Sequence, residues 1–119
     1  MNSTEKITGY HAHIYYEDEE TRAIAADIRE HIEANYGVQM GRWRDIPVGP
    51  HPKPMFQIAF DLDTFQQVVP WLMLNRRGLS ILIHPETGDH VPDHRDFPIW
   101  LGEKLALDIA FLEVGNTSA

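Results

Sequence analysis

The chain has 119 residues, the length of a single domain, and it contains no cysteine, which excludes disulfides, zinc–thiolate sites and thiol catalysis. Its net charge is −8 and it has no cluster of Lys or Arg, so a nucleic-acid partner is not expected. The 43% hydrophobic content argues against disorder. With no apolar leader and no run of membrane-spanning length, we expect one cytoplasmic domain over residues 1–119 with no membrane partner and an ordered core at about 7–113.

The first half of the chain predicts a strand, a helix and a strand pair. Residues 7–16 alternate and are rich in β-branched and aromatic side chains, which is typical of a strand. Residues 19–36 carry apolar side chains at helical spacing, and Gly37 is a natural helix end. Residues 38–48 and 55–60 are predicted as two strands joined by a proline-rich turn.

A second helix and a fourth strand follow. Asp63 or Thr64 can cap a helix over residues 65–75, in which Pro70 is the weak point. Residues 79–84 are predicted as the fourth strand.

The C-terminal third is less regular. Residues 85–98 are dense in Pro, Asp, His and Gly and are predicted as a loop. Residues 105–112 alternate strongly enough to predict a fifth strand, although a short helix over 104–109 is a competing interpretation. Residues 115–119 are predicted as a frayed tail.

The predicted order of elements is β-α-β-β-α-β, which is the ferredoxin-like pattern within the α/β (α+β) class. This fold has one sheet with strand order 4-1-3-2 and both helices on one face. The C-terminal strand would be an addition to it. Because the helix-free face needs a cover, we expect a homodimer in which two sheets form an α/β barrel, with residues 85–98 as a further cover.

The alternation of side chains along a strand brings polar residues together on the helix-free face. Apolar residues such as Ile14 and Ile58 are expected to face the helices. The turn that carries His51 is expected at the same edge of the sheet. The opposite face would then carry His11, His13, Tyr15, Gln57, Ala59 and His84.

Several segments, taken in order, resemble the DOPA 4,5-dioxygenase family of small extradiol ring-cleaving proteins. The resemblance runs from about Tyr10 to Glu113 and implies a ferredoxin-like subunit that opens a catechol ring with O2 and ferrous iron. The segments are His11-Ala-His13, Gly49-Pro-His-Pro52 followed by Met55-Phe-Gln57, His84-Pro-Glu-Thr-Gly88, Asp93-His94 and Trp100-Leu-Gly102.

Extradiol chemistry needs Fe(II) with open positions, which leaves room for about three protein ligands. We expect the metal ligands to be His13, His51 and His84, with zinc as a possible replacement for iron. A spare histidine, His11 or His94, would move the catechol proton, because an imidazole titrates near neutral pH. The carboxylate that often completes such a site has three candidates, Asp89, Asp93 and Glu113.

Other polar and aromatic side chains are candidates for holding the substrate. Arg42, Gln57 and Arg95 are predicted as substrate-binding residues, because guanidinium groups bind carboxylates in a fork. The arginines, together with Arg44, are equally compatible with a solvated edge. Tyr15, Trp43 and Trp100 could stack on an aromatic ring, although packing in a core or interface is the more common use of tryptophan.

Two other classes of function fit the same residues. In the first, the protein is a non-catalytic dimeric α/β-barrel module that binds a small aromatic molecule or a metal. In the second, it is a cofactor-free monooxygenase of the same architecture, which would resist chelators. The remaining two histidines are not expected to bind a metal, since His31 is expected on the surface of a helix and His90 in a loop.

Overall fold

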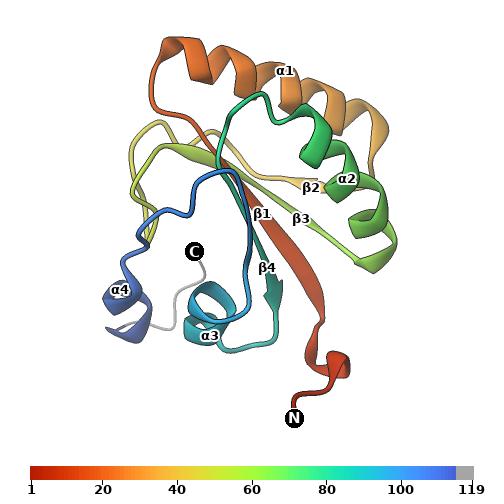
Figure 1. The fold of residues 1–119 in the computed structure, drawn as a ribbon, viewed down its shortest axis with the longest axis vertical. Coiled ribbons are helices and arrows are strands. Elements are labelled where there is room, and N and C mark those ends of the chain that lie inside the picture. Colours follow the sequence, from red (N-terminus) through yellow and green to blue (C-terminus); the bar gives the residue numbers. More distant parts are fainter. Residues whose placement is uncertain (115–119) are drawn as a thin grey trace.

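A computed structural model describes residues 1–114, so the predicted tail lies outside the described residues. Within that range no helix is both long and apolar enough to cross a membrane. Figure 1 shows the arrangement of the elements. In chain order they are η1 (Thr4–Lys6), β1 (Gly9–Tyr15), α1 (Glu19–Asn35), β2 (Gln39–Met40), β3 (Met55–Phe60), α2 (Leu62–Asn75), β4 (Ile81–Glu86), α3 (His90–Arg95), β5 (Ile99–Leu101) and α4 (Ile109–Val114).

The five strands form one sheet in the order β2-β3-β1-β4-β5, and all pairs are antiparallel. The first four strands therefore have the predicted order, and the order of elements through β4 is confirmed. The sheet of this chain is open and is not a closed barrel, while the dimeric barrel stays a prediction. In the register of the central strand, His11 lies between Ala59 and His84, and His13 lies between Gln57 and Leu82.

Helices α1 and α2 lie on one side of the sheet, and α3 and α4 on the other (Figure 1). The side chains between the sheet and the first helix pair form the main core, where Ile14, Ile58 and Ile81 are fully buried. A smaller cluster on the opposite side contains Tyr15 and Leu82. The predicted assignment of strand faces is therefore confirmed for these residues.

The predicted strand over residues 38–48 is largely wrong, because only Gln39 and Met40 form β2. Beyond them a single isolated bridge joins Arg44 to Met55. Pro47 has no N–H to donate to a ladder. The chain also passes very close to β3 at Gly41, where a Cβ would lie 2.8 Å from the carbonyl oxygen of Gln57.

The C-terminal predictions need two corrections. The predicted loop contains the helix α3, and the fifth strand is β5 rather than residues 105–112. The alternating apolar side chains of residues 105–112 do not form a strand. Instead, Leu105 and Leu107 pack on the cluster around Tyr15 and Leu82. The competing helix over 104–109 is also wrong, since α4 begins only at Ile109.

The N-cap of α2 is Asp61, and not Asp63 or Thr64 as predicted, so the helix is longer than expected and continues through Pro70. An Asp61 carboxylate oxygen accepts a hydrogen bond of 2.9 Å from the backbone N–H of Thr64. Replacing Asp61 by alanine is expected to lower the melting temperature by a few degrees, because that N–H loses its partner. Asparagine at this position also caps helices, so Asp61→Asn should melt within about a degree of the parent in the same calorimetric scan.

Candidate metal centre

Four histidines from four parts of the chain meet on the side of the sheet that faces α3 and α4. His13 comes from β1, His84 from β4, His94 from α3, and His51 from the turn before β3. None of the four is more than 3% exposed. The predicted convergence of these histidines is observed within a single chain. Helix α3 and the segment containing Leu105 cover part of this histidine group.

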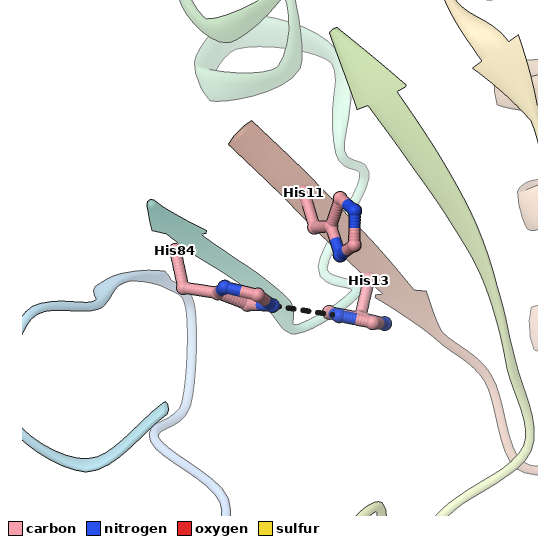
Figure 2. A group of neighbouring side chains, drawn as sticks. All are labelled: His11, His13 and His84. Atoms are coloured by element: carbon pink, nitrogen blue, oxygen red, sulfur yellow. Dashed lines mark hydrogen bonds between the residues drawn. The ribbon is translucent and has the colours of Figure 1, made fainter. Parts of the chain in front are cut away.

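The rings are close enough to share one bound atom. The Nε2 atoms of His13 and His84 lie 3.1 Å apart. His51 lies next to His13, with ring centroids 4.2 Å apart, and His94 lies next to His84 at 4.1 Å. Figure 2 shows how the His11 ring approaches this pair from β1. One potential ligand atom from each of His11, His13 and His84 lies within 4.8 Å of the others.

Backbone carbonyls orient two of these rings. The Nδ1–H of His84 donates to the carbonyl of Pro85 at 2.9 Å, and the Nδ1–H of His94 donates to the carbonyl of His90 at 2.7 Å. With Nδ1 carrying the proton, the lone pair lies on Nε2. A carbonyl that fixes the tautomer from behind is the usual outer contact of a metal-binding histidine.

Tyr15 orients the His51 ring. The Tyr15 hydroxyl lies 2.6 Å from Nδ1 of His51, and the Tyr15 ring is stacked on Trp100 at a centroid distance of 6.2 Å. Two of the three aromatic residues predicted as able to stack on a substrate ring, Tyr15 and Trp100, therefore contact each other, and Tyr15 also contacts His51. Trp43 belongs to the main core on the other side of the sheet, where Arg22 lies 3.9 Å above its ring.

Several buried ring nitrogens have no hydrogen-bond partner among the described residues. These are Nδ1 of His11, His13 and His90, and Nε2 of His51 and His94. A buried polar atom without a partner is costly, so this concentration indicates that the group binds something. Two imidazoles that bind one metal at right angles and about 2.1 Å would place their nitrogens ~3.0 Å apart. The donor set and the His13–His84 separation therefore fit a divalent transition metal.

Burial keeps the imidazoles neutral. It lowers the pKa of His11 to about 4 and that of His51 to about 3, in both cases with a further contribution from the neighbouring His94. Burial likewise lowers the pKa of His84 to about 2 and depresses the pKa of His13 and His94. A neutral imidazole is the form that binds a metal, so the site is ready for one at neutral pH.

Glu86 belongs to the site but was missed from the sequence. Its Oε1 lies 3.1 Å from Nδ1 of His11 and 3.6 Å from Nδ1 of His84. The His11 contact has the distance of a hydrogen bond but not its alignment, and Nδ1 remains unpartnered. Burial raises the pKa of Glu86, and the nearby Asp93 raises it further. The predicted strand stopped at His84, whereas β4 continues to Glu86, which the period of two places on the same face.

The predicted carboxylate candidates have different positions. Asp93 is fully buried, but its two oxygens accept hydrogen bonds from the Thr87 N–H at 2.9 Å and the Thr87 hydroxyl at 2.6 Å. This contact fastens α3 to the end of β4 and thereby places His94. Asp89 and Glu113 are exposed. Possible ligand atoms of Glu86, His90 and Asp93 also lie within 4.8 Å of one another.

The predicted substrate-binding residues are only partly brought to the site. Gln57 is half-buried and pairs with His13 in the register of the sheet. Arg42 is exposed, and the exposed Arg95 pairs with Asp96 at 2.8 Å. Within residues 1–114, the recorded contacts join neither arginine to the histidines. The proposed roles of the two arginines therefore stay predictions.

A cavity of about 470 Å³ reaches the surface beside His11 and Glu86, whose side chains are 14% and 22% exposed. It is lined at the ends of β1 and β3 by residues that include Gly9, Ala59 and Asp61. A larger cavity of about 720 Å³ touches His84, but its walls are mostly apolar and include η1. Because the other histidines are buried, the smaller cavity is the better approach to the histidine group.

Comparison with known proteins finds two fungal relatives of similar sequence. The chain is 33% identical over 115 residues to an uncharacterized 21.2 kDa protein of Botryotinia fuckeliana, covering 87% of this chain and 63% of that protein. It is 31% identical over 117 residues to a DOPA 4,5-dioxygenase of Amanita muscaria, covering 92% of this chain and 51% of that protein. The chain thus spans only about half to two thirds of the length of these relatives.

The chain is also similar to a solved structure. A crystal structure from Nostoc punctiforme, described provisionally as a dioxygenase, superposes with a TM-score of 0.93 at 54% identity and covers 96% of this chain and 98% of that one. The model of the Dopa 4,5-dioxygenase family matches residues 10–111, which include all the histidines of the buried group. The chain therefore belongs to the Dopa 4,5-dioxygenase family.

Proposed function

We propose that the protein is an extradiol-type dioxygenase that opens the ring of a catechol, such as DOPA or a related dihydroxyphenyl compound, with O2 at a histidine-bound Fe(II). The observation that supports this most directly is the group of buried, neutral imidazoles with unpartnered nitrogens. Family membership supports the reaction class. A homodimer remains part of the proposal.

The residues that would hold the metal are His11, His13 and His84. Their mutual distances favour this set over the one expected from the sequence, in which His51 took the place of His11. Bound Fe(II) would supply a Lewis acid with open positions for the two reactants. The protein's part is to hold the imidazoles neutral and to exclude water from around them, which it does by burying His13 and His84.

His94 is the proposed base. Its Nδ1–H is held by the carbonyl of His90, so Nε2 carries the lone pair and can accept a proton from a catechol hydroxyl. The lowered pKa keeps this nitrogen unprotonated before the substrate arrives. His51, hydrogen-bonded to the Tyr15 hydroxyl, lies next to His13 and would complete the wall of the substrate site.

The test is anaerobic reconstitution with Fe(II), followed by O2 uptake and visible absorbance with DOPA, caffeate and protocatechuate. We expect O2 consumption matched to a yellow ring-opened product, and loss of both when a chelator removes iron. Tight iron binding without turnover of any catechol would favour the non-catalytic binding module. Turnover that survives the chelator would favour a cofactor-free monooxygenase.

Blocking the cavity beside His11 should weaken substrate binding without removing the metal. Ala59 lies opposite His11 in the sheet and lines this cavity, so Ala59→Leu would fill part of it. We expect KM to rise about tenfold, equivalent to about 1.4 kcal/mol of binding free energy, with iron content unchanged, because the leucine side chain would occupy space that the substrate needs. The exposed Ala23 on α1 gives the matched control, since Ala23→Leu should change neither. An unchanged KM in Ala59→Leu would place the entrance elsewhere.

A further inference from the structure

Two carboxylates, those of Glu86 and Asp61, line the cavity of about 470 Å³ beside His11. No Lys or Arg is among its lining residues in the part of the chain that the structure describes. The net charge of the whole chain, −8, has the same sign as these two groups. A cavity with acidic groups and no basic ones in its wall favours a ligand that carries positive charge.

The register of the sheet places the two carboxylates on either side of Gly9. Glu86 of β4 pairs with Gly9 of β1. On the other side of β1, Tyr10 pairs with the last residue of β3, so Asp61 comes level with Gly9. Neighbouring strands lie about 4.8 Å apart, which puts the two Cα atoms about 10 Å apart across β1. Because glycine has no side chain to stand between them, one cationic group can contact both carboxylates.

Both carboxylates have oxygens to offer to a ligand. One Asp61 oxygen accepts the hydrogen bond from the N–H of Thr64, and within residues 1–114 no hydrogen bond to the other oxygen is recorded. The recorded contacts of the Glu86 oxygens, with ring nitrogens of His11 and His84, are not hydrogen bonds. The Glu86 side chain is only 22% exposed, and a carboxylate largely removed from water without a donor is costly. A donor on the ligand would remove that cost.

The interior of the same site indicates a ligand independently of these charges. His13, His51 and His94 each have a buried ring nitrogen without a partner among the described residues, and none of the three is more than 3% exposed. In the proposed reaction the catechol hydroxyls lie at this histidine group. The side chain of the catechol, on the far side of the ring from the hydroxyls, would then extend into the cavity that Glu86 and Asp61 line.

We propose that the substrate is a catechol whose side chain ends in an ammonium group, and that Glu86 and Asp61 bind this group. The inference rests on the proposed function, which supplies the catechol. An ammonium group has three N–H donors, enough for both carboxylates, and charge on donor and acceptor strengthens each hydrogen bond. A catechol with a carboxylate end, such as caffeate, would instead meet two like charges in the cavity.

The test compares three catechols that differ only at the end of the side chain, namely dopamine, the neutral 4-propylcatechol and 3-(3,4-dihydroxyphenyl)propanoate. Their dissociation constants are measured by calorimetry with the Co(II)-loaded protein in the absence of O2, so that no turnover is needed. A partly exposed ion pair favours binding by about fivefold, so with two carboxylates we expect dopamine to bind about tenfold more tightly than 4-propylcatechol. The propanoate should bind more weakly than both.

Two variants remove one charge each, Glu86→Gln and Asp61→Asn, and asparagine still caps α2. We expect the preference for dopamine over 4-propylcatechol to fall by about fivefold in Glu86→Gln and by about twofold in the more exposed Asp61→Asn. The affinity for 4-propylcatechol should stay at the parent level, which shows that the metal and the catechol site are intact. The matched control is Asp63→Asn, which changes an exposed carboxyl in the first turn of α2 outside the lining of the cavity and should keep the full preference.

The outcomes separate this inference from the proposed function. Equal affinity for the three catechols in the parent, or a preference for dopamine that survives when Glu86→Gln and Asp61→Asn are combined, overturns the inference even if the enzyme cleaves catechols. A Co(II)-loaded parent that binds none of the three catechols defeats the proposed function and this inference together.

Discussion

Replacing His84 by alanine is expected to abolish Fe(II) binding and with it all ring cleavage above background. The reason is geometric, since Nε2 of His84 lies 3.1 Å from Nε2 of His13 and its lone pair is fixed by the bond from Nδ1–H to Pro85. Loss of this imidazole removes one of the two closest nitrogens of the group. Iron content after gel filtration and O2 uptake with a catechol measure the two effects separately.

His31→Ala is the matched control for this experiment. His31 lies on α1, on the other side of the sheet, with its ring stacked on Trp71 at 4.2 Å. Iron content and turnover should both stay at the level of the parent in this variant. Circular dichroism of both variants checks the fold. If His84→Ala keeps a full equivalent of iron, the proposed ligand set is wrong.

The choice between His11 and His51 as third ligand follows from the same assay. The distances favour His11, so His11→Ala should lose iron, whereas His51→Ala should retain it and lose turnover. The reverse pattern would restore the ligand set expected from the sequence. Both histidines have lowered pKa values, so their ionisation does not separate the two possibilities.

Much of the site could be predicted because it depends on the period of two within strands. Alternation along β1 places His11 and His13 on one face, and the strand order then brings His84 beside them. These relations need only local periodicity and a common topology. The burial of the histidines could not be predicted, since it depends on how α3 and the segment containing Leu105 fold back over the sheet.

The wrong prediction for residues 85–98 also has its origin in tertiary contacts. Residues 85–98 are rich in Pro, Gly and Asp, yet a six-residue helix forms there, and the buried Asp93 contributes by accepting two hydrogen bonds from Thr87. No local sequence pattern predicts the contact between Asp93 and Thr87. Glu86 was missed for a simpler reason, because Pro85 suggested the end of a strand. The strand β4 nevertheless contains Pro85, and it can do so because β5 pairs only with residues 81–83 and leaves that side of Pro85 unpaired.

The metal-free protein is expected to lose stability steeply as the pH falls below about 6.5. Burial lowers the folded-state pKa of His11 to about 4 and of His51 to about 3, while both ionise near 6.5 in the unfolded chain. The unfolded state therefore binds more protons than the folded state between these values. The contribution of these histidines to the free energy of unfolding is fully present above pH 6.5. It declines as the pH decreases, by about 1.4 kcal/mol per pH unit for each such histidine.

Urea midpoints of the chelated protein between pH 7.5 and pH 5.0 measure this slope. His51→Gln should reduce it by about one histidine's share, ~1.4 kcal/mol per pH unit, whereas the distant variant His31→Gln should keep the full slope. Carboxylates with lowered pKa values, such as Asp45, which pairs with Arg22, lose their contribution only at more acidic pH. A stability that stays flat from pH 7.5 to pH 5.0 would mean that the histidines are already protonated or solvated in the folded protein, which removes the basis for a neutral metal-binding group.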